Sequence, residues 1–274
     1  MKPYKMIAFD MDGTLLNSQK EISEKTVAAM KRAMDHGFTV VLNTGRCMAE
    51  LNKYFDVVDI PYVNSVSGAL VLDRRQNRAV FEKGLTPELA EQVLAIAAKE
   101  DVMIHILTEK SIVQKDAIAK MDYYQMGIYR GMFEKVTDQL ESLIETYLAD
   151  PFPVAKINLY HPSTEAREKT RALICEAGLP VELANSEIAS LEISAEGIHK
   201  GIGLQGLCDY LKIPMSRTVV VGDADNDIGA LKMAGLSVAM GNASEKIKKI
   251  CDVTVADNDH DGCREAIERF LFQE

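Results

Sequence analysis

Two carboxylates stand close together near the beginning of the chain, directly after a short apolar run. Asp10 and Asp12 follow residues 6–9 and precede Gly13 and Thr14. While the backbone is extended, residues two apart point to the same side, so both carboxylates can face one point in space. Two such charges about 4 Å apart repel each other by roughly 4 kcal/mol at an effective dielectric constant of about 20. A bound cation, a shared proton or a nearby lysine must therefore offset the repulsion.

A second acidic loop follows a later apolar run. Residues 218–221 lead into a loop that contains Asp223, Asp225, Asn226 and Asp227. Because ligands bind at the carboxyl ends of the strands in open α/β sheets, we expect this loop to meet the first acidic pair. The alternative is that Asp225 and Asp227 only cap the helix beside them. Oxygen ligands, without His or Cys residues at ligand spacing, favour Mg²⁺ over zinc, and the expected metal-site residues are Asp10, Asp12, Asp223 and Asp227.

A phosphate ligand also needs hydrogen-bond donors. Thr44 and Gly45 follow the apolar run 38–42 at a strand-to-helix turn, where a hydroxyl and a backbone N–H are available to an anion. Lys200 opens a predicted helix, and its ammonium group is suited to neutralise both a phosphate and a nucleophilic carboxylate. The alternative is that Lys200 is an ordinary solvated lysine.

The elements that must position these residues alternate between strands and helices. Near-continuous apolar strands separated by helices predict a Rossmann-like parallel sheet core with helices on both faces, an α/β fold. Ser23 is the expected N-cap of the first helix. Strands are predicted at 6–9, 38–42, 62–63, 69–72, 79–81, 218–221, 237–240 and 252–255, and helices at 23–36, 201–211, up to 233, 244–250 and from 261.

The middle of the chain has a different pattern and predicts a separate, inserted α/β module. We expect a catalytic core of residues 1–84 and 190–274 and an α/β cap of residues 85–189. Lys156 is expected to point inward from its strand. Helices are predicted at 86–99, 116–125, 137–147 and 163–177, and strands at 102–107, 111–114, 154–160, 181–183 and 190–193.

Bulk properties exclude several classes of partner. A formal net charge of −10 argues against nucleic acid or an anionic membrane as the main partner. We see no apolar run near the roughly 18 residues that cross a bilayer, and the N-terminal apolar segment is too short for a signal peptide, so we expect a cytoplasmic protein. The five cysteines are scattered along the chain. This spacing favours reduced, mostly packed thiols and argues against a zinc site or a disulfide framework.

Together the motifs resemble those of the haloacid dehalogenase (HAD) superfamily. Residues 10–14, Asp-Met-Asp-Gly-Thr, resemble its first motif, Thr44 the second, Lys200 the third, and residues 222–227, Gly-Asp-Ala-Asp-Asn-Asp, the fourth. The finer resemblance is to the Cof-like, type IIB branch, which carries a large α/β cap between the second and third motifs. The segments 239–243 and 258–262 also match this branch. The resemblance is strong in the core and rests on architecture alone in the cap.

The resemblance implies a role for each residue. Asp10 attacks phosphorus to give an aspartyl-phosphate, and Asp12 serves as general acid and then general base. Mg²⁺ is held by the Asp10 side chain, the Asp12 backbone carbonyl and Asp223, while Asp227 supports its waters. The groups implied for the phosphoryl oxygens are the Met11 amide, Thr44, Gly45, Lys200 and Asn226.

We therefore expect a Mg²⁺-dependent phosphatase of small phosphorylated metabolites, with sugar phosphates as the family default. Two alternatives stay open: a phosphomutase or phosphotransferase acting on sugar phosphates, and a non-catalytic phosphate-sensing module. His199 and His260 depart from the usual pattern. His199 either faces the substrate or packs beside the site. Neither the substrate nor the oligomeric state follows from the sequence.

Overall fold

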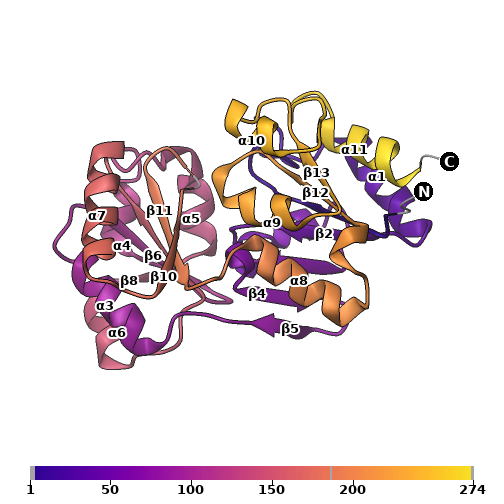
Figure 1. Cartoon of the computed structure of the whole chain (residues 1–274). Helices are drawn as coiled ribbons and strands as arrows, with labels where there is room; N and C mark the ends of the chain where they lie inside the picture. The colour runs from indigo at the N-terminus through magenta and orange to yellow at the C-terminus, as the bar shows by residue number, and fades with distance from the viewer. Residues whose placement is uncertain (1–3, 186, 273–274) are drawn as a thin grey trace. The chain divides into compact units, whose positions relative to one another are not determined.

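A computed structural model of the chain describes residues 4–185 and 187–272. They form two compact units, and Figure 1 shows the elements of each. The first unit comprises the chain up to Gly45, the segment Asn52–Glu82 and the chain from His199 onward. The second unit comprises Arg46–Leu51 and Lys83–Ile198.

The first unit is built on a mostly parallel sheet with the strand order β14-β13-β12-β1-β2-β3-β4-β5. Neighbouring strands are parallel from β14 to β3, and β4 and β5 are added as antiparallel hairpins. The central strands are buried along their length, as expected for strands covered on both faces. The bounds are β1 Met6–Phe9, β2 Thr39–Asn43, β3 Tyr62–Ser65, β4 Leu70–Asp73, β5 Arg78–Glu82, β12 Thr218–Gly222, β13 Leu236–Ala239 and β14 Val253–Thr254.

Helices cover both faces of this sheet. Met6 and Ala8 of β1 belong to a core cluster with residues of α8, α9 and α10, while α1 and α11 pack on each other and contact β2 and β12 (Figure 1). The predicted Rossmann-like core with helices on both faces is therefore confirmed. The helices are α1 Glu24–Asp35, α2 Asn52–Phe55, α8 Lys200–Leu211, α9 Ile228–Met233, α10 Glu245–Ile250 and α11 Gly262–Leu271, with 3₁₀ turns η2 Val66–Gly68, η4 Met215–Arg217 and η5 Asp225–Asp227.

The second unit has a sheet of its own with the order β10-β11-β9-β6-β7-β8. Its strands pair antiparallel except for β7 and β8. The strands are β6 Met103–Leu107, β7 Ser111–Gln114, β8 Asp138–Leu140, β9 Lys156–Tyr160, β10 Val181–Ala184 and β11 Ser190–Ala195. The helices are α3 Pro87–Ala97, α4 Lys115–Ala119, α5 Arg130–Val136, α6 Leu143–Ala149 and α7 Thr164–Glu176, with η1 Met48–Glu50 and η3 Gly127–Tyr129.

Several expectations for this unit differ from the structure. The helix predicted at 116–125 ends at Ala119, and α5 was not predicted. Residues 138–140, predicted as the start of a helix, form β8, because the edge of β7 offers them a parallel backbone ladder; α6 begins only at Leu143. The expected boundary between residues 189 and 190 also differs, since β11 pairs with β9 and β10 and the unit therefore continues to Ile198. The assignment of this unit as a substrate-selecting cap stays a prediction.

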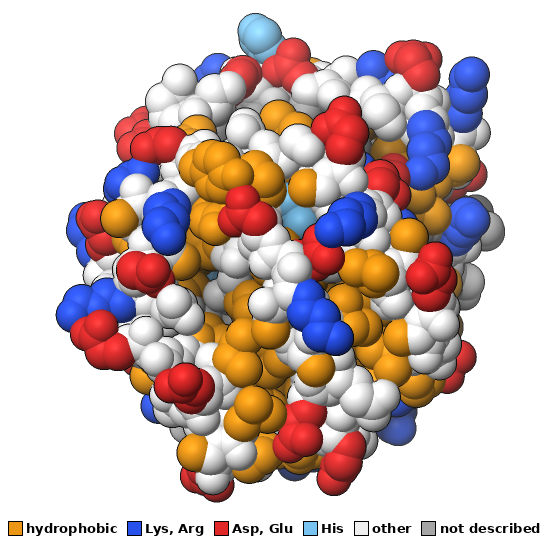
Figure 2. Space-filling view, turned by 90° about the vertical axis from the view of Figure 1, so that its left-hand side faces the viewer, with side chains coloured by type: hydrophobic (Ala, Val, Ile, Leu, Met, Phe, Trp, Pro, Cys, Tyr) orange, Lys and Arg blue, Asp and Glu red, His pale blue; other side chains and the backbone are white. Residues whose placement is uncertain are grey.

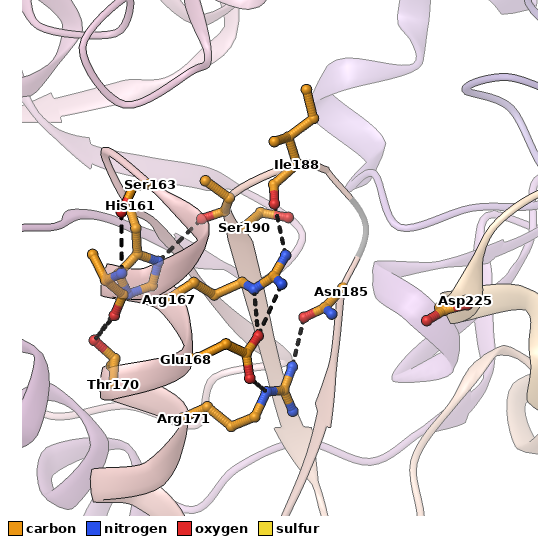
Figure 3. A network of polar contacts seen from close by, with 12 residues as sticks. His161, Ser163, Arg167, Glu168, Thr170, Arg171, Asn185, Ile188, Ser190 and Asp225 are labelled. Carbon is orange, nitrogen blue, oxygen red and sulfur yellow. Dashed lines mark hydrogen bonds and ion pairs between the residues drawn. The ribbon is translucent and has the colours of Figure 1, made fainter.

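Polar contacts join Asn185 and Ile188, which lie after β10 and before β11, to helix α7 (Figure 3). The guanidinium of Arg167 donates to the carbonyl of Ile188 at 2.7 Å, and that of Arg171 donates to Oδ1 of Asn185 at 2.5 Å. Glu168 pairs with both arginines, at 2.8 and 3.2 Å. One turn of α7 thus contacts both of these residues.

Buried charged groups lie inside the second unit. Lys156 is fully buried, as expected, and pairs with Glu192 at 3.0 Å. Ser111 joins Glu50 of η1 to His105, with distances of 3.3 Å to the carboxylate and 2.6 Å to the imidazole. Burial raises the pKa of Glu50 and lowers the pKa of His105 to about 3. Glu50 therefore anchors η1 in the second unit.

The surface is mixed in character. On the face shown in Figure 2, acidic and basic side chains are interspersed with apolar ones. Ile128 and Ile188 of the second unit are 71% and 73% exposed. Among the residues that the structure describes, no helix combines the length and the apolarity needed to cross a membrane.

Candidate active site

Strand β1 carries Asp10 to the middle of the first unit's sheet. It lies between β12 and β2, and its four residues are fully buried. The backbone N–H of Asp10 donates to the carbonyl of Val221 at 3.0 Å, so the ladder between β1 and β12 continues past the strand. Asp10 is thereby held at the carboxyl end of a central parallel strand, where only 5% of the residue is exposed.

The turn after Asp10 brings the chain against the second acidic loop. Gly13 has a φ of +80°, and a Cβ at this position would lie 2.4 Å from Oδ2 of Asp223. Both the backbone conformation and the available space therefore require glycine. The hydroxyl of Thr14 donates to Oδ1 of Asp223 at 2.6 Å. These contacts join the two acidic motifs, which lie more than two hundred residues apart in the sequence.

Three carboxylates and one ammonium group form the centre of the site. Oxygens of Asp10, Asp223 and Asp227 all lie within 4.8 Å of one another. Nζ of Lys200, which is fully buried, lies 2.6 Å from Oδ1 of Asp10 and 2.8 Å from Oδ1 of Asp227. The structure thus brings together the predicted residues of motifs one, three and four. With three carboxylates charged, the ammonium group leaves two negative charges for a ligand to balance.

The protonation behaviour of the cluster follows from burial and from its own charges. Burial, and then the charge of Asp227, raise the pKa of Asp10, although Lys200 opposes the shift. The same two causes raise the pKa of Asp223 to about 7. Burial disfavours the charged form of Lys200, but the Asp10 and Asp227 carboxylates outweigh it and raise the pKa of this lysine. Lys200 therefore remains a cation.

Asp227 uses both of its oxygens within the protein. Oδ1 accepts from Lys200 at 2.8 Å, and Oδ2 accepts from the backbone N–H groups of Asp223 and Ala224 at 3.1 and 3.2 Å. Asp227 thus caps the turn, as one interpretation expected, and also fixes Lys200. Asp225 is exposed and pairs with Lys246 at 2.9 Å, so it takes no part in the cluster.

Helix α8 places Lys200 at its first position. The helix is capped by His199, whose Nδ1 accepts from the N–H of Gly201 at 3.1 Å. The amide of Asn64, at the end of β3, donates to the carbonyl of Lys200 at 2.7 Å. His199 is therefore a capping residue, and its ring packs against Gly229, where a Cβ would lie 2.2 Å from Nδ1. His260, the other departure from the family pattern, is exposed and lies 2.6 Å from Asp257.

The backbone N–H and C=O groups of Thr44 are both hydrogen-bonded. Its N–H donates to the carbonyl of Asn64 at 2.8 Å, and its carbonyl accepts from Ser67 at 3.0 Å. Val66 and Ser67 have φ values of 50° and 56°, a conformation that is costly for a β-branched residue. The supporting turn is thus strained, and it holds the strand end that precedes Gly45 rigidly.

Some predicted residues are not brought into the carboxylate cluster. The carboxylate of Asp12 lies 2.8 Å from Nζ of Lys20, and it is not among the three clustered acids. Met11 is fully buried; its carbonyl accepts from Thr14 and Leu16. Roles for the Met11 and Gly45 amides and for the Asp12 carbonyl remain predictions.

The donor set suits a hard divalent cation. Carboxylate oxygens are the ligands that Mg²⁺ takes in proteins, and three of them converge here. Oδ1 of Asn226, in the same loop, is a buried acceptor with no hydrogen-bond partner among the described residues. A bound ion or one of its waters would satisfy this orphaned oxygen. An acidic cluster able to hold a divalent metal ion is therefore present.

Sequence reasoning missed two supporting residues. Thr14 belongs to the first motif, so its position in the sequence indicated that it lies near the acidic residues. No feature of the sequence marked Asn64, because its contacts with Thr44 and Lys200 depend on which strand lies next to β2.

Comparison with known proteins decides the family. The family model for haloacid dehalogenase-like hydrolases matches residues 7–267. The chain belongs to this family. It is 30% identical over 278 residues to 5-amino-6-(5-phospho-D-ribitylamino)uracil phosphatase YitU of Bacillus subtilis, covering 98% of this chain and 97% of the relative. It is 27% identical to the HMP-PP phosphatase of Cronobacter sakazakii over 242 residues, covering 88% of this chain and 85% of the relative.

Solved structures agree with this assignment. A haloacid dehalogenase-like hydrolase from B. subtilis superimposes with a TM-score of 0.86 at 26% identity, over 97% of this chain and all of the other. A sugar phosphatase of HAD subclass IIB superimposes with a TM-score of 0.82 at 23% identity, over 97% of this chain and 98% of the other, which bears on the fold alone. The predicted family is confirmed, and the protein is a phosphatase. The type IIB branch stays a prediction.

Proposed function

We propose that this protein is a Mg²⁺-dependent phosphatase in which Asp10 is the nucleophile and Asp12 the general acid and base. The observation that carries the proposal is the cluster of Asp10, Asp223 and Asp227 around the buried ammonium of Lys200 at the carboxyl end of β1 and β12. Active sites of open α/β sheets lie at this edge. Perturbed pKa values of Asp10 and Asp223 are also typical of catalytic sites.

The residues that would hold Mg²⁺ are the Asp10 and Asp223 carboxylates and the Asp12 carbonyl. Asp227, whose two oxygens are engaged by Lys200 and backbone N–H groups, would fix Lys200 and the loop instead of ligating directly. Asn226, with its orphaned oxygen, is suited to a water of the ion or to a phosphoryl oxygen. When bound, Mg²⁺ supplies positive charge that offsets the carboxylates and the phosphate.

The first half-reaction forms a covalent intermediate. A carboxylate oxygen of Asp10 forms a bond to phosphorus while the bond from phosphorus to the leaving oxygen breaks, and Asp12 gives its proton to that oxygen. In the second half-reaction a water attacks phosphorus and passes a proton to Asp12, while the bond to Asp10 breaks. Inorganic phosphate leaves, and both carboxyl groups return to their starting states.

The phosphoryl oxygens need fixed donors during both steps. The Thr44 hydroxyl, the Gly45 and Met11 amides and Lys200 would provide them. The strained turn behind Thr44 and the cap on Lys200 support this role, because donors held in place before the reaction lose little free energy by reorganising during it. Lys200 would thus screen the phosphate from the carboxylates beside it.

The names of two relatives support a proposal for the substrate class. The name of the B. subtilis relative gives a phosphate on a ribityl chain, and the subclass IIB structure is of a sugar phosphatase. In both, the phosphate ester belongs to a polyhydroxylated carbon chain. We infer that this protein takes small cytoplasmic metabolites of that kind, sugar phosphates among them, and that the second unit selects the organic part.

The test is release of inorganic phosphate from a panel of sugar and alditol phosphates, with Mg²⁺ and with EDTA, for the wild type and Asp10→Asn. We expect Mg²⁺-dependent release, lowered at least about a thousandfold in the variant. Isomerised sugar phosphate without free phosphate would identify a mutase. A stable phospho-aspartate without turnover would identify a phosphate-sensing module.

A further inference from the structure

The acid that the proposed mechanism assigns to proton transfer is held by a lysine that no motif contains. Nζ of Lys20 lies 2.8 Å from Oδ1 of Asp12, and the two side chains are 27% and 28% exposed. Both residues belong to the first unit. Eight positions separate them, so the contact depends on the turn between them and not on a shared strand or helix.

That turn is built to place Lys20. The backbone N–H of Lys20 donates to the carbonyl of Asn17 at 2.9 Å. Oδ1 of Asn17 accepts from the N–H groups of Gln19 and Glu21, at 3.0 and 2.9 Å. The hydroxyl of Tyr54 donates to the carbonyl of Lys20 at 3.3 Å. The peptide groups on both sides of the lysine are therefore fixed, and with them the direction in which its side chain leaves the backbone.

A lysine at this position carries a backbone cost. Lys20 has a φ of 60°, a left-handed conformation that costs a residue with a Cβ about 1–2 kcal/mol and that glycine adopts freely. A partly exposed ion pair contributes about 0–1 kcal/mol. The gain from the pair with Asp12 is thus no larger than the backbone cost.

We propose that Lys20 is a positioning residue for Asp12, and that the hydrogen bond from its ammonium group to Oδ1 fixes the orientation of the carboxyl group that transfers the proton. The proposal rests on the proposed function, since it assigns a role to Lys20 only through Asp12. An aspartic acid side chain has two rotatable bonds. Held at one oxygen, it presents the same geometry to each leaving group, and general acid catalysis depends on that geometry.

The proposal predicts an effect that depends on the leaving group. A p-nitrophenolate ion leaves without a proton, whereas phenolate benefits from one, and the two aryl phosphates are otherwise alike. Losing the orientation of Asp12 should therefore slow phenyl phosphate more than p-nitrophenyl phosphate. A variant that only disturbs the fold or phosphate binding slows both by the same factor.

The experiment measures kcat/KM for both esters, in Mg²⁺, with Lys20→Met, Lys20→Arg and a matched control. Lys25→Met is the control, because Lys25 pairs with Asp261 at 3.2 Å and belongs to neither acidic motif. We expect Lys20→Met to lower kcat/KM about tenfold more for phenyl phosphate than for p-nitrophenyl phosphate, which is a part of the total that general acid catalysis contributes. Lys20→Arg should recover most of the loss, and Lys25→Met should match the wild type.

A double-mutant cycle completes the test. In an Asp12→Asn background, Lys20→Met should cause no further loss, because the residue through which Lys20 acts has been removed. An equal loss on both esters, full additivity with Asp12→Asn, or faster turnover in Lys20→Met would each overturn the proposal while wild-type activity upheld the proposed function. A wild type that releases phosphate in Mg²⁺ from neither aryl ester nor any sugar or alditol phosphate would overturn both.

Discussion

Replacing Asp10 with asparagine should remove activity and yet stabilise the metal-free protein. The substitution keeps the size of the side chain and an oxygen that accepts from Lys200, and it removes one buried negative charge. The two readouts move in opposite directions, as expected where a site is organised for a ligand that balances its charge.

The magnitude follows from the distances in the cluster. Lys200 lies 2.6 Å from Asp10, which at an effective dielectric constant of about 20 corresponds to an attraction of roughly 6 kcal/mol. Oxygens of Asp223 and Asp227 lie within 4.8 Å, and each repels Asp10 by at least about 3.5 kcal/mol on the same scale. Attraction and repulsion nearly cancel, so the cost of burying the charge remains. We therefore expect Asp10→Asn to gain about 1 kcal/mol without metal, or about 2–4 °C in Tm.

Magnesium should reverse the order of the two melting temperatures, so that the wild type becomes more stable than Asp10→Asn. An ion that binds only the folded wild type stabilises it by about 2.7 kcal/mol at one hundred times its Kd. Asp10→Asn lacks one carboxylate ligand and should gain much less. The wild type should thus melt below the variant in EDTA and above it in saturating Mg²⁺.

Thermal unfolding followed by circular dichroism, in EDTA and across a Mg²⁺ titration, measures both melting temperatures directly. Asp225→Asn is the matched control, because it removes a charge from the same loop. Asp225 pairs with Lys246 at the surface, so the melting temperatures of this variant in EDTA and in Mg²⁺ should match those of the wild type. A metal-free Asp10→Asn protein that melts several degrees below the wild type would refute the charge balance derived above. Equal stabilisation of both proteins by Mg²⁺ would remove Asp10 from the metal site.

Other buried positions give further predictions. Because burial lowers the pKa of His105 from 6.5 to about 3, the unfolded chain binds the extra proton between these values, and folding stability falls as pH decreases through that window. His105→Gln should remove up to about 1.4 kcal/mol of this loss per pH unit, measured by urea unfolding from pH 7 to 5. Lys156→Met should cost about 3–5 kcal/mol in urea, because it leaves the Glu192 charge buried without its ammonium partner, and Lys156→Met with Glu192→Leu should recover most of it. Gly13→Ala should lose Mg²⁺-dependent stabilisation in thermal unfolding, since its Cβ would lie 2.4 Å from an oxygen of the acidic cluster.

Each of these has a result that would contradict it. Parallel pH profiles for wild type and His105→Gln would mean that His105 is not the group that resists protonation. A double variant no more stable than Lys156→Met would show that packing, not the unpaired charge, sets the cost. Full Mg²⁺ stabilisation in Gly13→Ala would mean that the acidic loop shifts freely.

Features that depend on local interactions could be predicted from the sequence. Ser23 caps α1 through the N–H of Thr26, as its position before the apolar pattern predicts. Asp10 and Asp227 follow β1 and β12 of the same parallel sheet, and Lys200 opens α8, the helix that leads back to β12. All three therefore lie at the edge where the parallel strands end. The residue types and the topology together were enough to predict that these three side chains meet.

Contacts that depend on neighbouring elements were not predictable in this way. Residues 138–140 carry no strong strand pattern, and they form β8 because β7 presents an unpaired edge. Asn64 supports both Thr44 and Lys200 only because β3 lies beside β2. Lys20 reaches Asp12 through a turn set by the side chain of Asn17, and a lysine among polar residues gives no sign of such a contact.

The membership of η1 in the second unit limits how this protein can be divided. An excised fragment that begins at Lys83 lacks Arg46–Leu51, and with it the Glu50 carboxylate to which Ser111 donates. A shortened chain that deletes Lys83–Ile198 keeps this carboxylate but removes the groups that bury it. The two units are therefore not interchangeable modules. Exchange of the second unit between relatives by recombination would have to carry the six residues after Gly45 along with it.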